Sequence, residues 1–205
     1  PGAALSLAIA EAATAAKRFT LLLTADSQSA ERLEQELGFF APELSVLHFP
    51  DWETLPYDQF SPHQDIISQR IASLYRLPEL SRGVLVVPIT TALHRLAPTR
   101  FLLGTSLVLD VGQKLNVEQM RTRLESAGYR CVDTVYEHGE FAVRGALIDL
   151  FPMGSELPYR IDLFDDEIET LRTFDAETQR SIDKVESIRL LPAREFPLDK
   201  KAVTD

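Results

Sequence analysis

Short apolar runs of strand length alternate with helical patterns in the first half of the chain. The runs at 19–24 (FTLLLT) and 83–89 (GVLVVPI) contain no polar alternation, which is typical of strands buried on both faces of a sheet. Two further strands are predicted at 45–49 and 106–111. Helical patterns lie between the strands, at 5–16, 30–37, 64–77 and 90–96. Strands that alternate with helices indicate a parallel sheet with helices on its faces, so residues 1–112 are predicted to form an α/β domain.

The pattern changes after Gly112, where one helix at 117–126 is followed by consecutive strands with tight turns. The strands are predicted at 130–136, 141–151, 159–164, 168–175 and 185–191. Consecutive strands joined by short turns form antiparallel sheets. Residues 113–193 are therefore predicted to form a smaller α+β domain, and residues 194–205 to begin a further segment.

The composition is that of an ordinary globular protein with an acidic surface. Of the 205 residues, 45% are hydrophobic, and the net charge is −10, with both predicted domains acidic. This charge argues against non-specific DNA binding. The single cysteine, Cys131, excludes an internal disulfide and a cysteine-rich zinc site, and its strand context predicts a core residue. A chain without disulfides fits the cytoplasm, and its longest apolar runs are too short to span a membrane.

Motifs for nucleotide binding, metal binding and catalysis are missing from the sequence. A phosphate-binding loop needs glycines beside a lysine and a Ser or Thr, but no Gly-Lys pair occurs in the chain. The acidic run at 165–167 is interpreted as a solvated hairpin turn and not as a magnesium site. The four histidines, His48, His63, His94 and His138, lack metal-binding spacing. The sequence thus predicts no catalytic residue, no cofactor, no metal and no enzymatic activity.

One predicted strand, at 159–164, has an unusual outer face. Because side chains alternate along a strand, Tyr159, Ile161 and Leu163 share an apolar face that should pack on the core. The opposite face carries Arg160, Asp162 and Phe164. An exposed aromatic beside an arginine is typical of interface hot spots. The alternative interpretation, equally open from the residues alone, places Phe164 in a second small core under the helix at 64–77 or under the tail.

Several long motifs give the chain a family resemblance. They read DWETLPYD at 51–58, SPHQDIIS at 61–68, EHGE at 137–140, RGALIDLFPMG at 144–154 and RID at 160–162. With these motifs the chain resembles the amino-terminal region of bacterial transcription-repair coupling factors (Mfd), and the resemblance covers essentially the whole chain.

The resemblance implies a fold and a role for each domain. The first domain is expected to resemble the motor domain of the repair protein UvrB in a degenerate form that has lost its nucleotide-binding residues. The second is expected to resemble the UvrB domain that docks on UvrA. Full-length members recognise RNA polymerase stalled at DNA damage, push it along double-stranded DNA with an ATP-driven motor, and recruit UvrA to nucleotide excision repair. Their polymerase-binding and motor domains lie outside this chain.

The resemblance also implies a binding site for UvrA. The family's contact residues fall on Arg144, Arg160 and Phe164, and Arg144 adjoins Gly145, where the sequence predicts a bulge that re-aims its side chain. The arginines are expected to make two-pronged contacts with acidic groups of UvrA, while Phe164 fills an apolar pocket. In the family a distant carboxy-terminal domain covers this face, so this chain is expected to bind without activation. It is expected to be a cytoplasmic monomer with no membrane contact.

Two other functions remain open at this stage. The likeness to UvrB suggests a DNA-binding module equivalent to the damage-binding region of UvrB, although the corresponding segment here holds only Trp52, Tyr57 and Phe60 among acidic residues. A degenerate nucleotide hydrolase is the second alternative. The role of the motif at 51–58, in a packed loop or in contact with a partner, also stays open.

Overall fold

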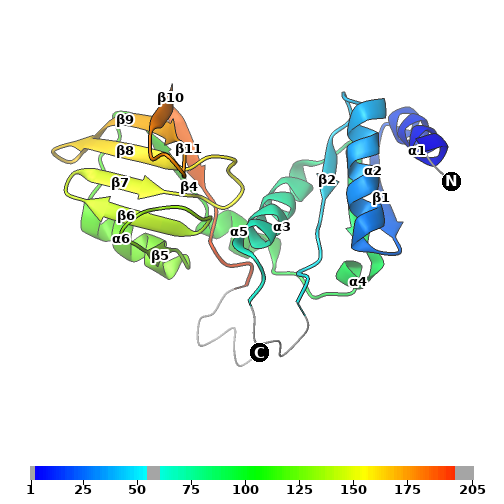
Figure 1. Ribbon diagram of the computed structural model, residues 1–205, viewed down its shortest axis with the longest axis horizontal. Helices are drawn as coiled ribbons and strands as arrows, with labels where there is room; N and C mark the ends of the chain where they lie inside the picture. Colours follow the sequence, from blue (N-terminus) through cyan, green and yellow to red (C-terminus); the bar gives the residue numbers. More distant parts are fainter. Residues whose placement is uncertain (1–2, 55–60, 197–205) are drawn as a thin grey trace. The chain divides into compact units, whose positions relative to one another are not determined.

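The computed structural model describes residues 3–54 and 61–196, and the chain divides into two compact units, Pro1–Thr99 and Arg100–Asp205 (Figure 1). The sequence places the change of pattern later, after Gly112. The difference arises because the strand expected at 106–111 pairs with a strand of the second unit, as described below.

The first unit is a three-stranded parallel sheet with helices, which confirms the predicted α/β class. Its strands have the order β1-β3-β2, and both neighbours of β3 run parallel to it. Its elements are α1 (Ala3–Ala16), β1 (Phe19–Thr24), α2 (Ser27–Phe40), β2 (Val46–His48), α3 (Gln64–Arg76), the short 3-10 helix η1 (Leu77–Glu79), β3 (Gly83–Pro88) and α4 (Ile89–Ala92).

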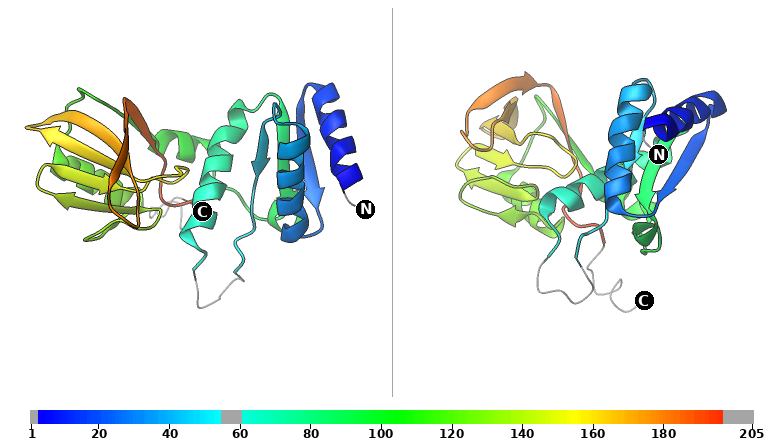
Figure 2. Two further views of the ribbon diagram at one scale, coloured as in Figure 1. Left: turned by 45° about the horizontal axis from the view of Figure 1, so that its top comes forward. Right: turned by 45° about the vertical axis from the view of Figure 1, so that its right-hand side comes forward.

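The core of the first unit lies between this sheet and the helices α1 and α2 (Figures 1 and 2). Asp26 starts α2, because its Oδ1 accepts a hydrogen bond from the Ser29 amide at 2.7 Å. The core residues of the cluster come from both helices and from β3: Ala10, Ala13, Ala30, Leu33, Leu37, Val84 and Val86. The central strand β3 is buried along its whole length, as its sequence predicts.

The strand β1 is not buried on both faces, so that prediction was wrong. Phe19, Leu21 and Leu23 are 37%, 52% and 48% exposed, while Leu22 packs against the core cluster. The reason is its place in the sheet: β1 is an edge strand, and α1 and α2 cover only the face to which Leu22 points. A continuous apolar run therefore identified the strand correctly but not its burial.

The second unit is built around a six-stranded sheet with the order β10-β9-β8-β7-β6-β5 (Figure 1). Its strands from β6 to β10 pair antiparallel with their neighbours, which confirms the predicted antiparallel sheet. Its elements are α5 (Thr99–Thr105, from the last residue of the first unit), β4 (Leu107–Asp110), α6 (Val117–Ser126), β5 (Arg130–Cys131), β6 (Glu140–Arg144), β7 (Leu147–Leu150), β8 (Tyr159–Phe164), β9 (Glu167–Phe174), β10 (Ser181–Val185) and β11 (Ser187–Leu190).

The inner face of this sheet carries the apolar residues that occupy alternate positions along its strands. Ile148, Ile161 and Leu171 lie side by side on β7, β8 and β9, and each is at most 1% exposed. The helix α6 buries Met120 and Leu124 and begins at Asn116, whose side chain caps the Gln119 amide. None of the helices in the described part of the chain is long and apolar enough to cross a membrane.

Several predicted strands of the second unit differ from those observed. The run at 141–151 is two strands joined at Gly145, the strand at 130–136 is only two residues long, and β10 was missed. The strand at 106–111 is β4, which pairs antiparallel with β11 and not with the parallel sheet. These errors concern long-range pairing and turn position, which local periodicity does not determine.

A buried arginine organises the loop that follows β2. Arg70, on α3, is 0% exposed, and its guanidinium lies over the rings of Phe49 and Trp52 at 4.0 and 4.6 Å from their centroids. It donates a 2.6 Å hydrogen bond to the carbonyl of Pro50. Trp52 in turn stacks on His94 at 4.9 Å. This part of the motif at 51–58 thus packs within the first unit, while residues 55–60 lie outside the described residues.

We expect Arg70→Ala to lower the free energy of unfolding of the first unit by ~3 kcal/mol. The change removes a desolvated cation–π contact and leaves a buried carbonyl without its donor. Chemical denaturation monitored by Trp52 fluorescence measures the effect. Arg76→Ala, at an exposed position of the same helix, is the control and should cost less than about 1 kcal/mol. Equal midpoints for Arg70→Ala and the wild-type chain would contradict this account of the loop.

Candidate protein-docking site

The outer face of β8 is as the alternation predicts. Ile161 and Leu163 are buried at 0% and 7% exposure, while Phe164, at the end of the strand, is 69% exposed. A second small core does exist on this face of the sheet, but it is formed by Val135, Ala142, Phe151 and Phe174. Phe164 is not part of it. Within the second unit, Phe164 is thus not a core residue, and its ring is exposed.

Phe164 lies at the end of the β8–β9 hairpin, whose turn is hydrogen-bonded to a neighbouring segment. The strands β8 and β9 are joined by two residues, with Phe164 opposite Glu167 and with Asp165 in the left-handed region at φ 55°. Backbone hydrogen bonds connect the turn to the segment before α6: Leu115 donates to the Asp166 carbonyl at 2.7 Å, and Ile168 donates to the Gln113 carbonyl at 2.9 Å. The end of the hairpin is thus held by hydrogen bonds to a segment that is not part of its two strands.

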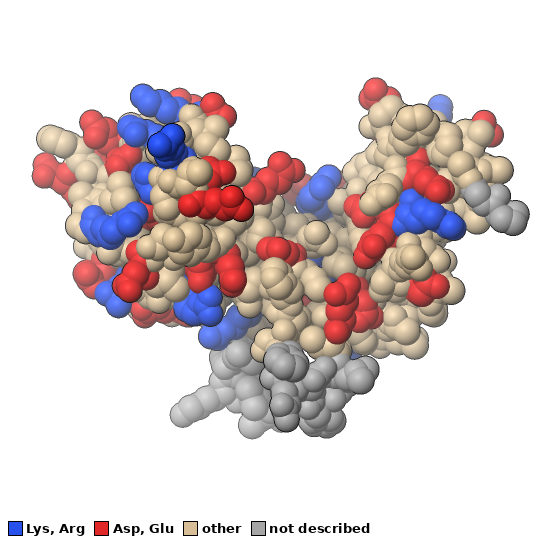
Figure 3. Space-filling model, viewed as in Figure 1, with Lys and Arg blue, Asp and Glu red and all other residues tan. Residues whose placement is uncertain are grey.

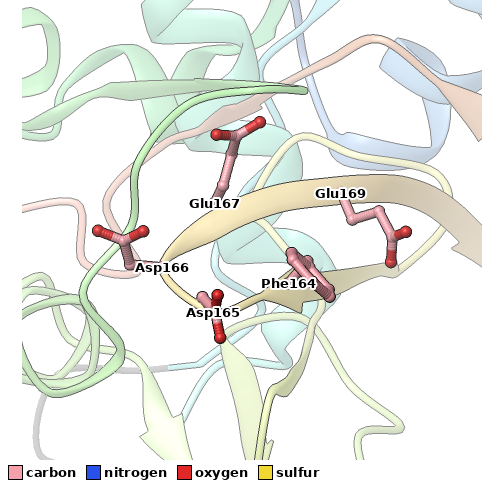
Figure 4. Close-up of a pocket in the computed structure, with 5 residues that line it drawn as sticks. All are labelled: Phe164, Asp165, Asp166, Glu167 and Glu169. Atoms are coloured by element: carbon pink, nitrogen blue, oxygen red, sulfur yellow. The ribbon is translucent and has the colours of Figure 1, made fainter.

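Acidic side chains surround the exposed ring. A register shift between Asp162 and Leu163 leaves Glu169 as an extra residue on β9, and Figure 4 shows it beside Phe164. A shallow pocket of about 320 Å³ is lined by Phe164, Asp165, Asp166, Glu167 and Glu169 (Figure 4). Lys114 pairs with Asp166 at 3.2 Å. The acidic run at 165–167 is a hairpin turn, as predicted. Within residues 3–54 and 61–196, no three His, Cys, Asp or Glu side chains are grouped so that they could hold a metal ion.

Four residues along the chain from Phe164, Arg160 is part of an ionic cluster with Asp149. Asp149 lies opposite Arg160 on β7 and is 1% exposed. Arg160 donates from Nε to Asp149 Oδ1 at 2.7 Å and from Nη2 to Oδ2 at 3.0 Å. Its guanidinium lies over the ring of Phe174 at 4.8 Å. The hydrogen bonds to Asp149 raise the pKa of Arg160 above the usual value for arginine, so this side chain is a fixed positive charge.

Arg144 joins the same cluster from the end of β6. Its Nη2 donates to Asp149 Oδ2, and its side chain is 47% exposed. Gly145 is not a bulge: with φ 63° it begins the two-residue turn between β6 and β7, where Arg144 pairs with Leu147. The turn brings Arg144 and Asp149 together, because the two strands fold back on each other.

The structure thus brings Arg144 and Arg160 together, while Phe164 stands at the far end of the same strand as Arg160. Sequence reasoning missed Asp149, which links the two arginines. The sequence gives one sign of its role, because an aspartate between Ile148 and Leu150 interrupts an apolar run. The arginines that pair with it follow only from the register of the strands. Cys131, predicted to be a core residue, is exposed, because β5 is an edge strand of the sheet.

The sequence of this chain is similar to those of known proteins along nearly its whole length. Residues 107–196 match the family model of the UvrB interaction domain. The transcription-repair-coupling factor of Escherichia coli K12 is 55% identical over 202 residues, that of Haemophilus influenzae 50% over 203, and that of Staphylococcus aureus USA300 31% over 196. The alignments cover 98%, 99% and 96% of this chain.

The chain is similar to transcription-repair-coupling factors over nearly its whole length. The resemblance inferred from the motifs is confirmed. The chain spans only 18%, 18% and 17% of the length of these three relatives. The match to the UvrB interaction domain begins at the residue where β4 begins and ends in the tail after β11, so it falls entirely on the second unit, which contains Arg144, Arg160 and Phe164.

We expect Phe164→Ala to change the free energy of unfolding of the second unit by less than about 1 kcal/mol, because the ring is exposed. Phe174→Ala, which removes a ring that is 0% exposed, should cost about 3 kcal/mol or more. Urea denaturation of both variants and of the wild-type chain measures the difference. A loss for Phe164→Ala as large as that for Phe174→Ala would mean that Phe164 serves the fold and not a partner.

Proposed function

We propose that the chain is a non-catalytic module that recruits UvrA and thereby links transcription stalled at DNA damage to nucleotide excision repair. The observation that carries the proposal is the 69% exposure of Phe164 on the strand that also carries Arg160 of the Arg144–Asp149–Arg160 cluster. Both lie in the segment that matches the UvrB interaction domain. The similarity to transcription-repair-coupling factors supports the repair role, and the proposed docking involves no cofactor.

The physical basis of docking is a rigid anchor with a charged neighbour. Aromatic rings and arginines dominate binding energy at protein interfaces when they fill desolvated pockets. The backbone at Phe164 is held by its hairpin, so little backbone entropy is lost when a partner encloses the ring. Arg144 supplies a half-exposed guanidinium that can pair with an acidic group on UvrA. The site therefore provides both an apolar anchor and a directional charge.

The wider activity proposed for the full-length protein rests on the family alone. In that proposal, RNA polymerase binding and ATP-driven movement on double-stranded DNA belong to segments other than this chain. The first unit acts as a scaffold for the second, and the module works in the cytoplasm as a monomer.

A DNA-binding module is the less favoured function. Acidic and basic side chains are interspersed on the face of the molecule shown in Figure 3, and the net charge of the chain is −10. Phosphate backbones are bound by clustered Lys and Arg, and this binding weakens steeply with salt. A gel shift with damaged duplex DNA at low salt tests this function, and a stable complex there would favour it over the proposal.

Titration calorimetry of the chain with purified UvrA tests the proposal. Phe164→Ala should weaken the affinity roughly 30-fold, since truncation of a central aromatic anchor costs about 2 kcal/mol. Phe39→Ala is a matched control, because Phe39 is 80% exposed but lies on α2 in the other unit. The control should bind like the wild-type chain. No binding of the wild-type chain at micromolar concentrations, or equal losses in both variants, would reject the proposal.

A further inference from the structure

The guanidinium of Arg160 is largely occupied by the protein itself. Of its three nitrogens, Nε and Nη2 donate to Asp149, and Nη1 donates to the carbonyl of Gln179 at 3.3 Å. The side chain is only 16% exposed. The edge formed by Nε and Nη2 is one that commonly receives a carboxylate with two parallel bonds. On Arg160 that edge is filled by Asp149, so a partner cannot use it without displacing Asp149.

Arg144 is in the opposite situation. Only its Nη2 donates to Asp149, and nearly half of the side chain is exposed. The two other nitrogens of its guanidinium carry N–H groups that can donate hydrogen bonds to a carboxylate of the partner. Of the two arginines, Arg144 is thus the one that has further N–H donors and is exposed enough to contact a partner.

The charges of the cluster lead to the same assignment. Two guanidiniums share one carboxylate, so the cluster carries a net charge of +1, with the negative charge buried and the better exposed positive charge on Arg144. Buried ion pairs are a weak source of stability, because apolar residues of similar volume often replace them without loss. Fixed orientation of the two arginines is what this arrangement supplies.

We propose that Asp149 is a positioning residue of the docking face: it clamps Arg160 over Phe174 and aims Arg144 at a single acidic group of the partner. This inference rests on the proposed function and refines it. Arg144 makes the ionic contact with the partner, and Arg160 acts by holding Asp149 in place.

Asp149→Asn tests the inference together with Arg144→Ala and the double variant, all titrated against UvrA. The amide keeps the shape of the side chain but removes the charge and turns one acceptor into a donor that faces a guanidinium. We expect Asp149→Asn to weaken UvrA affinity roughly tenfold. Because Asp149 acts through Arg144, the loss in the double variant should be much smaller than the product of the two single losses.

A spectroscopic measurement separates positioning from general damage to the fold. In the free wild-type chain, ¹⁵N-arginine NMR should show an Arg160 Nε–H that is protected from solvent exchange, and Asp149→Asn should lose that protection. Glu140→Gln is the matched control. Glu140 is also a buried carboxylate paired with an arginine, Arg130, but it lies at the other end of β6 from Arg144. It should reduce stability while leaving UvrA affinity and the Arg160 signal unchanged.

The outcomes distinguish this inference from the proposed function. Wild-type binding that Asp149→Asn leaves unchanged, or a double variant whose loss equals the product of the single losses, overturns the positioning role alone. A wild-type chain that does not bind UvrA overturns the proposed function and the inference with it. If thermal melts show that Asp149→Asn is unfolded, Asp149→Glu replaces it. This variant keeps the charge but displaces the carboxylate by one methylene, and it should give a smaller loss that is also coupled to Arg144→Ala.

Discussion

The outer face of the second unit is arranged around one buried carboxylate shared by two guanidiniums. Because Asp149 is 1% exposed, its charge must be compensated within the protein, and this requirement draws Arg160 down onto the sheet above Phe174. The guanidinium then lies over one ring of the small core formed by Val135, Ala142, Phe151 and Phe174. The ionic cluster therefore separates an apolar core at one end of the face from the exposed Phe164 at the other.

The same face combines rigidity with exposure, which usually oppose each other. Exposed aromatic side chains on loops lose conformational freedom when they bind. Phe164 instead sits on the last position of a strand, and backbone bonds from residues 113 and 115 hold the turn that follows it. The backbone ordering that binding at Phe164 would require has therefore already taken place during folding.

Local sequence patterns predicted which face of a strand each side chain occupies better than they predicted which strands pair with each other. Alternation at 159–164 placed Arg160 and Phe164 on the outer face correctly, and the classes of both sheets followed from the order of elements. The exposure of Leu21 did not follow, because burial of a strand depends on which helices reach each face. Nor did the hairpin at Gly145, since the apolar stretches at 141–143 and 146–148 made the whole run resemble one strand. Asp149 was hidden for the same reason: its role exists only once that hairpin sets the register.

The charges near Phe164 bear on selectivity as much as on affinity. Asp165, Glu167 and Glu169 line the pocket at the ring, so an approaching surface gains from the apolar contact only if it does not bring more negative charge. Nucleic acid phosphates fail this condition, as do acidic protein surfaces. At the other end of β8, the net positive cluster favours a carboxylate at Arg144. A partner that contacts both sites must therefore offer an apolar pocket without an acidic rim and an acidic group that reaches Arg144.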